Sequence, residues 1–420
     1  MALSKARDAA LKCLVMCERD GAYLNLSLRE CLAAVTDSRD AALATVIATG
    51  VVRNRLYIDN IIENLSSVKI KKLSVWIHNI LRMGVFSLKF LDKVPASAAV
   101  NECVRLARRY GHAASAGYVN ALLRRAASSG DFLPREGTDE YLSVKYSLPM
   151  WLVKMWKEQG YGEELFALSN ETPKTIVRKN TLKDGALGDD FVKMQGAPDA
   201  YEYIGAGSCE NTPQYKAGLF SVQDLSSQKS LLSPPPKKGD KILDLCAAPG
   251  GKSAYMAALT NNESEMVCCD IHSHKLALIE KNFLRLGVKN ASVIKNDAAV
   301  LNNDFTEKFD YVLVDAPCSG LGIIRRKPDI KWSKSAEDFK ALAALQKKIL
   351  TAAAGYVKKG GVLVYSTCTI NRTENEDNAA WFLTAHKGFK ITKACAPLGV
   401  QLVFGRGGTD GFYHASFERM

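Results

Sequence analysis

KILDLCAAPGGK, residues 241–252, reads as a short buried strand that ends in a glycine-containing turn before a helix. Beyond it the chain alternates apolar strand-like runs (MVCCD, ASVIKND, FDYVLVDAP and GVLVYSTC) with helical stretches, the longest at about 336–357. Strands that alternate with helices predict a doubly wound, mostly parallel α/β sheet, which binds ligands at the carboxyl ends of its strands. We therefore expect one domain of this kind over residues 223–420.

The residues before this sheet divide into two further regions. From Ser4 to Ser129 apolar residues recur at helical spacing, and short breaks separate six or seven helices, so we predict an all-helical domain over residues 1–130. A turn-rich stretch follows at 128–138. Residues 140–222 mix helical segments with strand-like runs such as Thr175–Lys179, which predicts a small α+β domain.

Composition and charge narrow the class of protein. The chain has 47% hydrophobic and 24% charged residues, as ordinary soluble proteins do, which excludes long disorder. Its net charge is +12, of which residues 1–130 supply +9, and this asymmetry favours a polyanionic partner. Eleven cysteines without Cys-x-x-Cys pairs predict reduced thiols and no metal site. The N-terminus does not resemble a secretory signal, and no apolar run is long enough to cross a membrane, so we expect a cytoplasmic protein.

The glycine-containing turn and the strand ends predict a nucleoside-type cofactor. Gly250 and Gly251 allow a ligand to approach the backbone closely. Four carboxylates stand at the ends of successive strands: Asp244, Asp270, Asp297 and Asp315. Such a carboxylate can accept hydrogen bonds from ribose hydroxyls. The turn lacks the spacing of a phosphate cradle, and an acid-lined rim suits the cationic, phosphate-free S-adenosylmethionine.

Two cysteines follow strands at the same predicted edge. Cys318 lies in DAPCSG after the fourth strand, and Cys368 lies in STCT after the fifth. A free cysteine is usually a small buried apolar residue. We interpret six others in this way: Cys13, Cys31, Cys103, Cys246, Cys268 and Cys269. Polar loops in a cleft, near Lys252, instead favour a reactive thiol.

Five motifs resemble, in order and spacing, those of the NOL/NOP/Sun family of RNA cytosine-C5 methyltransferases. They are GLFSVQDLSSQ (218–228), DLCAAPGGK (244–252), DAPCSGLG (315–322), STCT (366–369) and GTDGFY (408–413). GIIRRKPDIKW (322–332) resembles more narrowly the 16S ribosomal RNA enzymes of the Sun/RsmB type. ATGVVRN (48–54) and YVNALLRR (118–125) are similar to the antitermination factor NusB. The resemblance implies a NusB-like helical bundle, a small α+β linker domain and a Rossmann-like methyltransferase domain dependent on S-adenosylmethionine.

The resemblance also implies roles for the site residues. Carbon 5 of cytosine is a poor nucleophile until a thiolate adds to carbon 6. The resemblance assigns that addition to Cys368 and assistance in product release to Cys318, while Asp315 would hold the base and Lys252 would support the cleft. The cofactor would lie on the backbone of Cys246, Ala247, Ala248, Pro249, Gly250, Gly251 and Lys252, with Asp270 at its ribose, Asp297 near its adenine and Asp315 near its methionine end.

The implied substrate is 16S ribosomal RNA, at cytosine 967, either free or in an early assembly particle and with no obligate protein partner. The target base should be unpaired or flipped out, because a duplex hides carbon 6. We expect the following side chains to contact RNA: Arg178, Asn180, Arg325, Arg326 and Lys327 near the cleft, and Arg105, Arg108, Arg109, Arg124 and Arg125 in the helical domain.

Three alternatives stay open at this point. A DNA cytosine-C5 methyltransferase would use the Pro-Cys thiol, Cys318, but the presence of Cys368 argues against it. A transfer RNA enzyme would need the same active site as a ribosomal RNA enzyme. A non-catalytic RNA-binding or assembly factor would retain the basic helical domain with a vestigial cofactor site, which the intact motifs disfavour.

Overall fold

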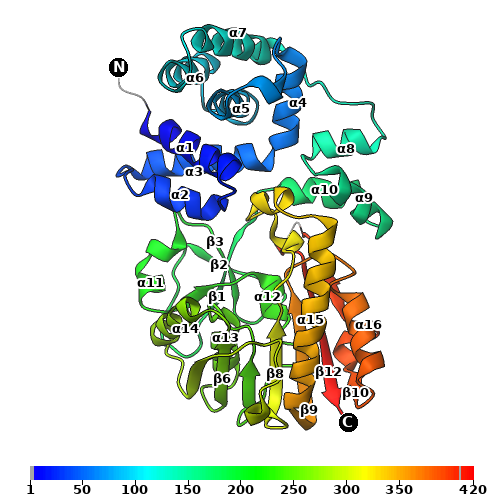
Figure 1. Cartoon of the computed structure of the whole chain (residues 1–420). Coiled ribbons are helices and arrows are strands. Elements are labelled where there is room, and N and C mark those ends of the chain that lie inside the picture. Colours follow the sequence, from blue (N-terminus) through cyan, green and yellow to red (C-terminus); the bar gives the residue numbers. More distant parts are fainter. Residues whose placement is uncertain (1–3, 406–407) are drawn as a thin grey trace. The chain divides into compact units, whose positions relative to one another are not determined.

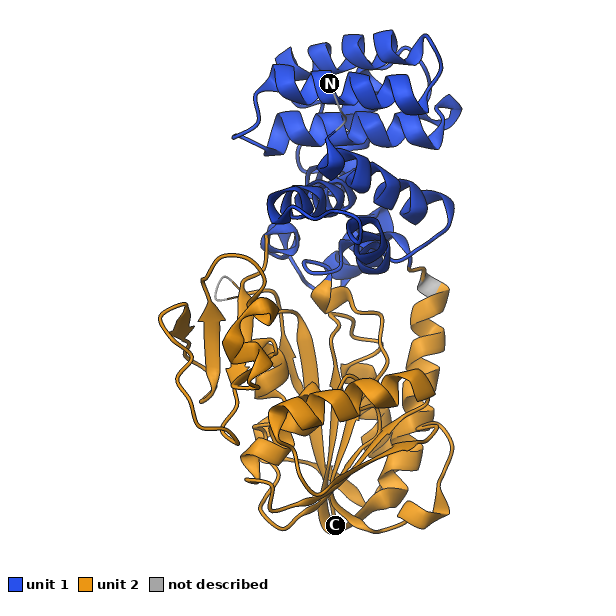
Figure 2. Ribbon diagram, turned by 90° about the vertical axis from the view of Figure 1, so that its left-hand side faces the viewer, with its two compact units in different colours: residues 1–171, 324–333 blue, residues 172–323, 334–420 orange. Residues whose placement is uncertain are grey.

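A computed structural model describes residues 4–405 and 408–420, so residues 1–3 of the predicted first domain lie outside the described residues. The chain forms two compact units (Figure 2). Unit 1 comprises Met1–Glu171 and Ile324–Ser333, and unit 2 comprises Thr172–Ile323 and Lys334–Met420. Compactness does not show which parts fold independently, so the domain boundaries 1–130, 140–222 and 223–420 stay predictions.

Unit 1 is helical (Figure 1). Its helices are α1 (Lys5–Arg19), α2 (Leu24–Leu32), α3 (Ser38–Arg53), α4 (Arg55–Leu65), α5 (Val75–Phe90), α6 (Ala96–Tyr110), α7 (Ser115–Ser128), α8 (Asp139–Lys145), α9 (Met150–Glu158) and α10 (Glu163–Asn170), with a 3₁₀ turn η1 (Ile70–Lys72). The helical bundle predicted from the sequence is confirmed in α1–α7. One apolar core joins α1, α3, α5, α6 and α7 through side chains such as Leu14, Ile47, Leu81 and Leu123.

A short segment from the second half of the chain completes unit 1. Residues 324–333, with the 3₁₀ turn η5 (Pro328–Trp332), contact α3. The Lys331 side chain is 1% exposed and donates hydrogen bonds to the carbonyl oxygens of Arg53 (2.8 Å) and Ser147 (2.9 Å) and to Asn170 Oδ1 (3.1 Å). Because its three donors are all satisfied inside unit 1, Lys331 anchors this segment there.

Unit 2 contains a small antiparallel sheet in the order β2-β3-β1-β4. Its elements are β1 (Thr175–Lys179), β2 (Phe191–Lys193), β3 (Ala200–Tyr203), η2 (Cys209–Asn211), α11 (Pro213–Lys216), β4 (Phe220–Val222) and α12 (Leu225–Lys229). The strand at 175–179 matches the sequence prediction. Strand β2 was not predicted, because three residues are too few to show an alternating pattern.

The larger sheet of unit 2 has the strand order β10-β12-β9-β8-β5-β6-β7, with β11 paired to β12. Its strands are β5 (Lys241–Asp244), β6 (Glu265–Asp270), β7 (Ala291–Lys295), β8 (Phe309–Asp315), β9 (Val357–Thr367), β10 (Phe389–Ile391), β11 (Val400–Leu402) and β12 (Phe412–Arg419). Its helices are α13 (Gly251–Leu259), α14 (Ser273–Leu286), α15 (Ala336–Tyr356) and α16 (Glu376–Ala385), with 3₁₀ turns η3 (Asn303–Phe305), η4 (Leu321–Ile323) and η6 (Lys393–Cys395). β5 through β9 pair with one another in parallel, and β12 runs antiparallel to β9. The predicted doubly wound, Rossmann-like fold is confirmed.

The side chains of the parallel strands point alternately to the two faces of the sheet, and helices cover both faces. On β8, Val312 and Val314 belong to a core shared with α15 and α16, whereas Tyr311 and Leu313 belong to one shared with α13 and α14. Successive side chains of a strand point to opposite faces, so apolar residues at every position bury both. Over the residues that the structure describes, no helix is long and apolar enough to cross a membrane.

Candidate active site

A pocket of about 270 Å³ lies at the carboxyl ends of β5, β6 and β8 and beyond the end of β7. It is lined by Leu245, Cys246, Ala248, Asp270, Ile271, His272, Lys275, Asn296, Asp297, Ala298, Asp315, Pro317, Leu345 and Ile349. Three carboxylates from successive strand ends thus meet in one pocket with apolar side chains. This set of side chains suits S-adenosylmethionine. Carboxylates accept hydrogen bonds from the two ribose hydroxyls and attract the positively charged sulfonium, and apolar side chains can enclose the adenine.

The glycine-containing turn supplies one wall of this pocket. Gly250 has φ = +98°, and a Cβ there would approach Phe283 to 3.2 Å and Ile279 to 3.3 Å, so glycine is required for backbone conformation and space. Of the predicted cofactor residues in the turn, Cys246 and Ala248 line the pocket. The pocket lining does not include Ala247, Pro249, Gly250, Gly251 or Lys252. Sequence analysis missed His272, Lys275 and Asn296, which follow β6 and β7 and carry no motif of their own.

Asp244 differs from the other strand-end carboxylates, and its predicted place at the rim is wrong. It is 1% exposed and does not line the pocket. Its carboxylate accepts hydrogen bonds from Ser253 Oγ (2.6 Å) and from the Cys246 backbone N–H (3.3 Å), and so orders the turn from beneath. Burial raises the pKa of Asp244 to about 7.

This raised pKa gives a test in solution. Because the folded-state pKa lies above the unfolded value of 3.8, the folded state binds more protons, and stability falls as pH rises from about 4 to about 7. At about 1.4 kcal/mol per pKa unit the loss is a few kcal/mol. Asp244→Asn should remove this dependence, so the stability of the variant relative to wild type should increase between pH 5 and pH 8 in urea titrations. An unchanged difference between the two proteins would contradict the assignment.

Asp315 and Lys252 form an ion pair beside the pocket. Lys252 Nζ lies 2.7 Å from Asp315 Oδ2, and Ser366 Oγ donates to Asp315 Oδ1 at 2.8 Å. The ammonium also lies 5.0 Å from the centre of the Phe412 ring. Lys252 therefore contacts the carboxylate at the end of β8 and does not line the pocket, and its supporting role stays a prediction.

The two predicted cysteines meet. Cys318 follows β8, Cys368 follows β9, and their Sγ atoms are 3.3 Å apart in a half-buried position. β8 and β9 are adjacent parallel strands, so their carboxyl ends bring the two loops together. The hydrogen bond to Cys368, then burial, raises the pKa of Cys318 well above its ordinary value. The two sulfurs are within hydrogen-bonding distance, and either can be the donor.

A buried carboxylate that the sequence analysis missed holds the loops of the two cysteines. Glu374, which is 0% exposed, accepts from the Ser319 N–H (2.9 Å) and Ser319 Oγ (2.5 Å), next to Cys318. It also accepts from Gln346 Nε2 (3.0 Å) and Asn371 Nδ2 (2.9 Å). The only sequence feature that could have indicated Glu374 is the acidic run TENED (373–377), which follows the STCT motif. A run of acidic residues does not show which of its carboxylates is buried.

The glycine-rich motifs explain how these loops approach. The Gly322 N–H donates to the Cys368 carbonyl (3.0 Å), and the Gly411 N–H donates to the Gly322 carbonyl (2.8 Å). A Cβ on Gly322 would overlap the carbonyl oxygen of Gly411. DAPCSGLG, STCT and GTDGFY therefore meet at one site although they are far apart in the sequence.

Three of the predicted RNA-contacting residues are buried, and their prediction was wrong. Arg178 and Asn180 are each 1% exposed and Arg325 is 2% exposed. Arg178 donates to Gln223 Oε1 (2.7 Å) and lies over the Tyr255 ring, and Asn180 donates to the carbonyls of Gly218 and Leu286. The structure therefore places these three side chains away from the surface.

The other predicted RNA-contacting side chains are accessible. Arg326, Lys327, Arg108, Arg109, Arg124 and Arg125 are exposed, and Arg105 is partly exposed and paired with Glu102 at 2.7 Å. Their contact with RNA stays a prediction. Among the described residues, no cluster of three or more His, Cys, Asp or Glu side chains could hold a metal ion.

The strand order, the acid-lined pocket and the turn after β5 together define the class of protein: a methyltransferase that uses S-adenosylmethionine. Comparison with known families gives the finer grouping. The profile of the family described as 16S rRNA methyltransferase RsmB/F matches residues 231–418, and that of the NusB family matches residues 4–128.

Relatives match over the full length. A Bacillus subtilis protein named probable ribosomal RNA small subunit methyltransferase B is 34% identical over 448 residues, covering 100% of both chains. A Vibrio cholerae protein named ribosomal RNA small subunit methyltransferase B is 34% identical, covering 91% of this chain and 90% of its own. The chain belongs to the RsmB family of ribosomal RNA small subunit methyltransferases and is an S-adenosylmethionine-dependent RNA methyltransferase.

Solved structures share the fold of this chain. The crystal structure of PH0851 has a TM-score of 0.83 and 25% identity, and covers 100% of this chain and 99% of its own. NSun6 from Pyrococcus horikoshii with SFG has a TM-score of 0.56 at 20% identity, with 68% of this chain and 98% of that chain covered, and so shares the fold.

Proposed function

We propose that this protein transfers a methyl group from S-adenosylmethionine to carbon 5 of a cytosine in 16S ribosomal RNA, at position 967. The observation that carries the proposal is the pair of thiols 3.3 Å apart after β8 and β9, because the end of β8 also contributes Asp315 to the cofactor pocket. Family membership supports the ribosomal RNA substrate. The names of the relatives give the small subunit but not the nucleotide.

In the proposed mechanism Cys368 adds to carbon 6 of the cytosine. The new S–C6 bond gives carbon 5 the electron density to accept the methyl group, which the bound cofactor supplies. Cys318, for which we propose the role of base, must first lose its own proton to solvent. Its sulfur then takes the carbon-5 proton, the C5–H electrons re-form the C5–C6 double bond, and the S–C6 bond breaks so that Cys368 leaves as a thiolate and the methylated RNA is released. Cys318, whose sulfur lies 3.3 Å from that of Cys368, is close enough to the proposed nucleophile to assist product release.

Asp315 has two proposed tasks, because its carboxylate lines the cofactor pocket and lies at the end of β8 beside the Cys318 loop. It would hold the cytosine near N3 and its exocyclic amine, and so stabilise charge that develops on addition. Lys252 and Ser366, which contact the two oxygens of Asp315, would fix the orientation of this carboxylate. Asp270 would contact the cofactor ribose and Asp297 its adenine.

We propose that the exposed arginines of α6 and α7 add a general electrostatic contribution to RNA binding, which would weaken as salt rises. The substrate would be 16S ribosomal RNA, free or in an early assembly particle, in the cytoplasm, and no obligate protein partner is needed for the proposed chemistry.

The test is methyl transfer in vitro. Purified protein, tritiated S-adenosylmethionine and unmodified 16S ribosomal RNA should give labelled RNA, and bisulfite sequencing should find one new 5-methylcytosine, at position 967. Transfer RNA and a DNA copy of the same sequence serve as competing substrates. Label in transfer RNA alone would move the assignment to that substrate, and no transfer to any RNA would favour a binding or assembly factor.

A further inference from the structure

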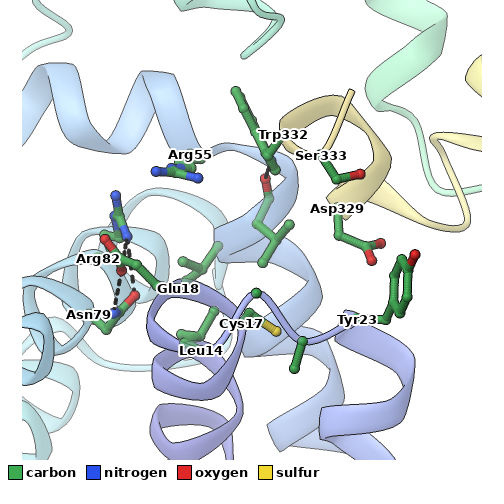
Figure 3. A pocket seen from close by; sticks show the side chains of 14 residues that line it. Leu14, Cys17, Glu18, Tyr23, Arg55, Asn79, Arg82, Asp329, Trp332 and Ser333 are labelled. Carbon is green, nitrogen blue, oxygen red and sulfur yellow. Dashed lines mark hydrogen bonds and ion pairs between the residues drawn. The ribbon is translucent and has the colours of Figure 1, made fainter. Parts of the chain in front are cut away.

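Unit 1 contains a cavity of about 370 Å³ that the methyl-transfer chemistry does not use (Figure 3). It is lined by Leu14, Cys17, Glu18, Gly21, Ala22, Tyr23, Val51, Val52, Arg55, Asn79, Arg82, Asp329, Trp332 and Ser333. Its volume lies in the range of small-ligand sites, which are mostly apolar with a few placed polar groups. Its walls come from the helical bundle and from the anchored segment 324–333.

Most polar groups of this cavity are already satisfied. Arg82 binds Glu18 at 2.7 Å and Asp59 through two nitrogens, also at 2.7 Å. Asn79 donates to Glu18 Oε2 (2.7 Å) and to the Val75 carbonyl (2.9 Å). Because these side chains hydrogen-bond to one another, they stabilise the cavity wall and are not available to bind a ligand.

Two charged groups in the lining retain hydrogen-bonding capacity. Arg55 is half-buried, its guanidinium lies 5.3 Å from the Trp332 ring centre, and it makes no hydrogen bond or ion pair with the part of the chain that the structure describes. Asp329 Oδ2 accepts from the Leu24 N–H at 3.2 Å, whereas its Oδ1 has no partner among residues 4–405 and 408–420. Figure 3 shows Arg55 and Trp332 at one side of the cavity and Asp329 and Tyr23 at another.

We propose that this cavity binds an unpaired guanine base of the RNA substrate. An ionised carboxylate only accepts hydrogen bonds, and guanine presents two adjacent donors, N1–H and the N2 amine, on its Watson–Crick edge. A guanidinium pairs with guanine O6 and N7, and aromatic side chains such as Trp332 and Tyr23 stack on splayed bases. Cytosine and adenine offer the carboxylate one amine, and uracil offers one N–H.

The segment that forms one wall of the cavity follows the loop of Cys318 in the sequence. Asp329 and Trp332 end the stretch 315–333 that begins with Asp315 and Cys318. The Trp332 indole N–H donates to the Val52 carbonyl at 2.9 Å, which fixes the ring in the cavity wall. A guanine bound here would therefore contact the segment that follows the loop of Cys318 in the sequence. This inference rests on the proposed RNA substrate.

The test measures base preference in the full-length protein. Fluorescence anisotropy with the labelled oligoribonucleotides UUUGUUU, UUUAUUU, UUUCUUU and UUUUUUU should show the guanine-containing RNA binding about tenfold more tightly than the others. Asp329→Asn, which keeps an acceptor for the Leu24 N–H, should abolish this preference. Arg55→Lys, which removes the planar fork, should weaken binding of UUUGUUU alone.

The matched control is Asp92→Asn, which removes the same charge from an exposed side chain of unit 1 outside the cavity. Loss of a negative charge by itself slightly strengthens RNA binding, so a loss of guanine preference in Asp329→Asn cannot come from net charge. Equal binding of the four RNAs by wild type, or an unchanged preference in Asp329→Asn, overturns the proposal. Guanosine 5′-monophosphate that binds as tightly as UUUGUUU overturns RNA as the source of the base.

Methyl transfer to 16S ribosomal RNA is measured on the same wild-type preparation. Transfer without guanine preference means that the cavity proposal alone has failed. Guanine preference without transfer to any RNA means that the proposed function alone has failed.

Discussion

Cys368→Ala is expected to lower the rate of methyl transfer by about 10⁴-fold or more, the scale seen when a nucleophile is removed. Without the sulfur no bond forms at carbon 6, so no covalent RNA–protein adduct should appear on a denaturing gel with 16S ribosomal RNA and tritiated S-adenosylmethionine. The fold should be retained, because Cys368 is half-buried and the change removes one atom.

Cys318→Ala is the matched variant, since it removes the neighbouring sulfur, 3.3 Å away. It should form the adduct but fail to release it, so that methylated RNA stays attached to the protein. Both variants should bind the cofactor as wild type does, because neither cysteine lines the cofactor pocket. If the adduct depends on Cys318 and persists in Cys368→Ala, the two roles are reversed and the DNA-type mechanism applies.

Glu374→Ala is expected to cost about 3–5 kcal/mol of folding free energy, since each unsatisfied buried donor costs about 1–3 kcal/mol. The change removes the acceptor of four buried hydrogen bonds, which are donated by the backbone N–H and hydroxyl of Ser319 and by the side-chain amides of Gln346 and Asn371. The Ser319 hydroxyl keeps Thr369 Oγ1 at 2.7 Å and the Gln346 amide keeps the Pro317 carbonyl at 2.9 Å. Urea unfolding followed by circular dichroism measures the loss. Because Ser319 follows Cys318, the variant should also lose methyl transfer at temperatures where it remains folded.

Two comparisons make this result specific. Glu374→Gln keeps one acceptor oxygen and should cost less than the alanine variant. Glu280→Ala, at an exposed position of α14, should change stability by no more than about 0.5 kcal/mol. A Glu374→Ala protein as stable as Glu280→Ala would show that the buried network does not support the two loops.

Local patterns were sufficient for most of the fold. The runs after residue 241 predicted β5 through β9, because strands buried on both faces are continuous apolar runs bounded by turns. The C-terminal strands β10–β12 were not predicted. β10 and β11 have three residues each, and the apolar residues of β12 are mixed with polar ones, so their pairing depends on β9 and on one another.

Part of the site could also be predicted without coordinates. In a doubly wound sheet the residues after parallel strands meet at one edge, so Cys318, Cys368, Asp270, Asp297 and Asp315 could be expected near one another. The structure brings the two thiols together and places the three carboxylates in one pocket. Glu374 escaped this reasoning because it lies within a charged run, where sequence does not distinguish a buried carboxylate from a solvated one.

The sequence by itself determined the order of the elements, the edge of the sheet where chemistry takes place and the residues available there, since these follow from local periodicity and connectivity. Tertiary structure alone decided which polar side chains face a cavity and which face the interior. Asp244 lies beneath the turn, Arg178 lies inside unit 2, and residues 324–333 complete a cavity in unit 1. Burial depends on packing between segments far apart in the chain, and no local pattern records that packing.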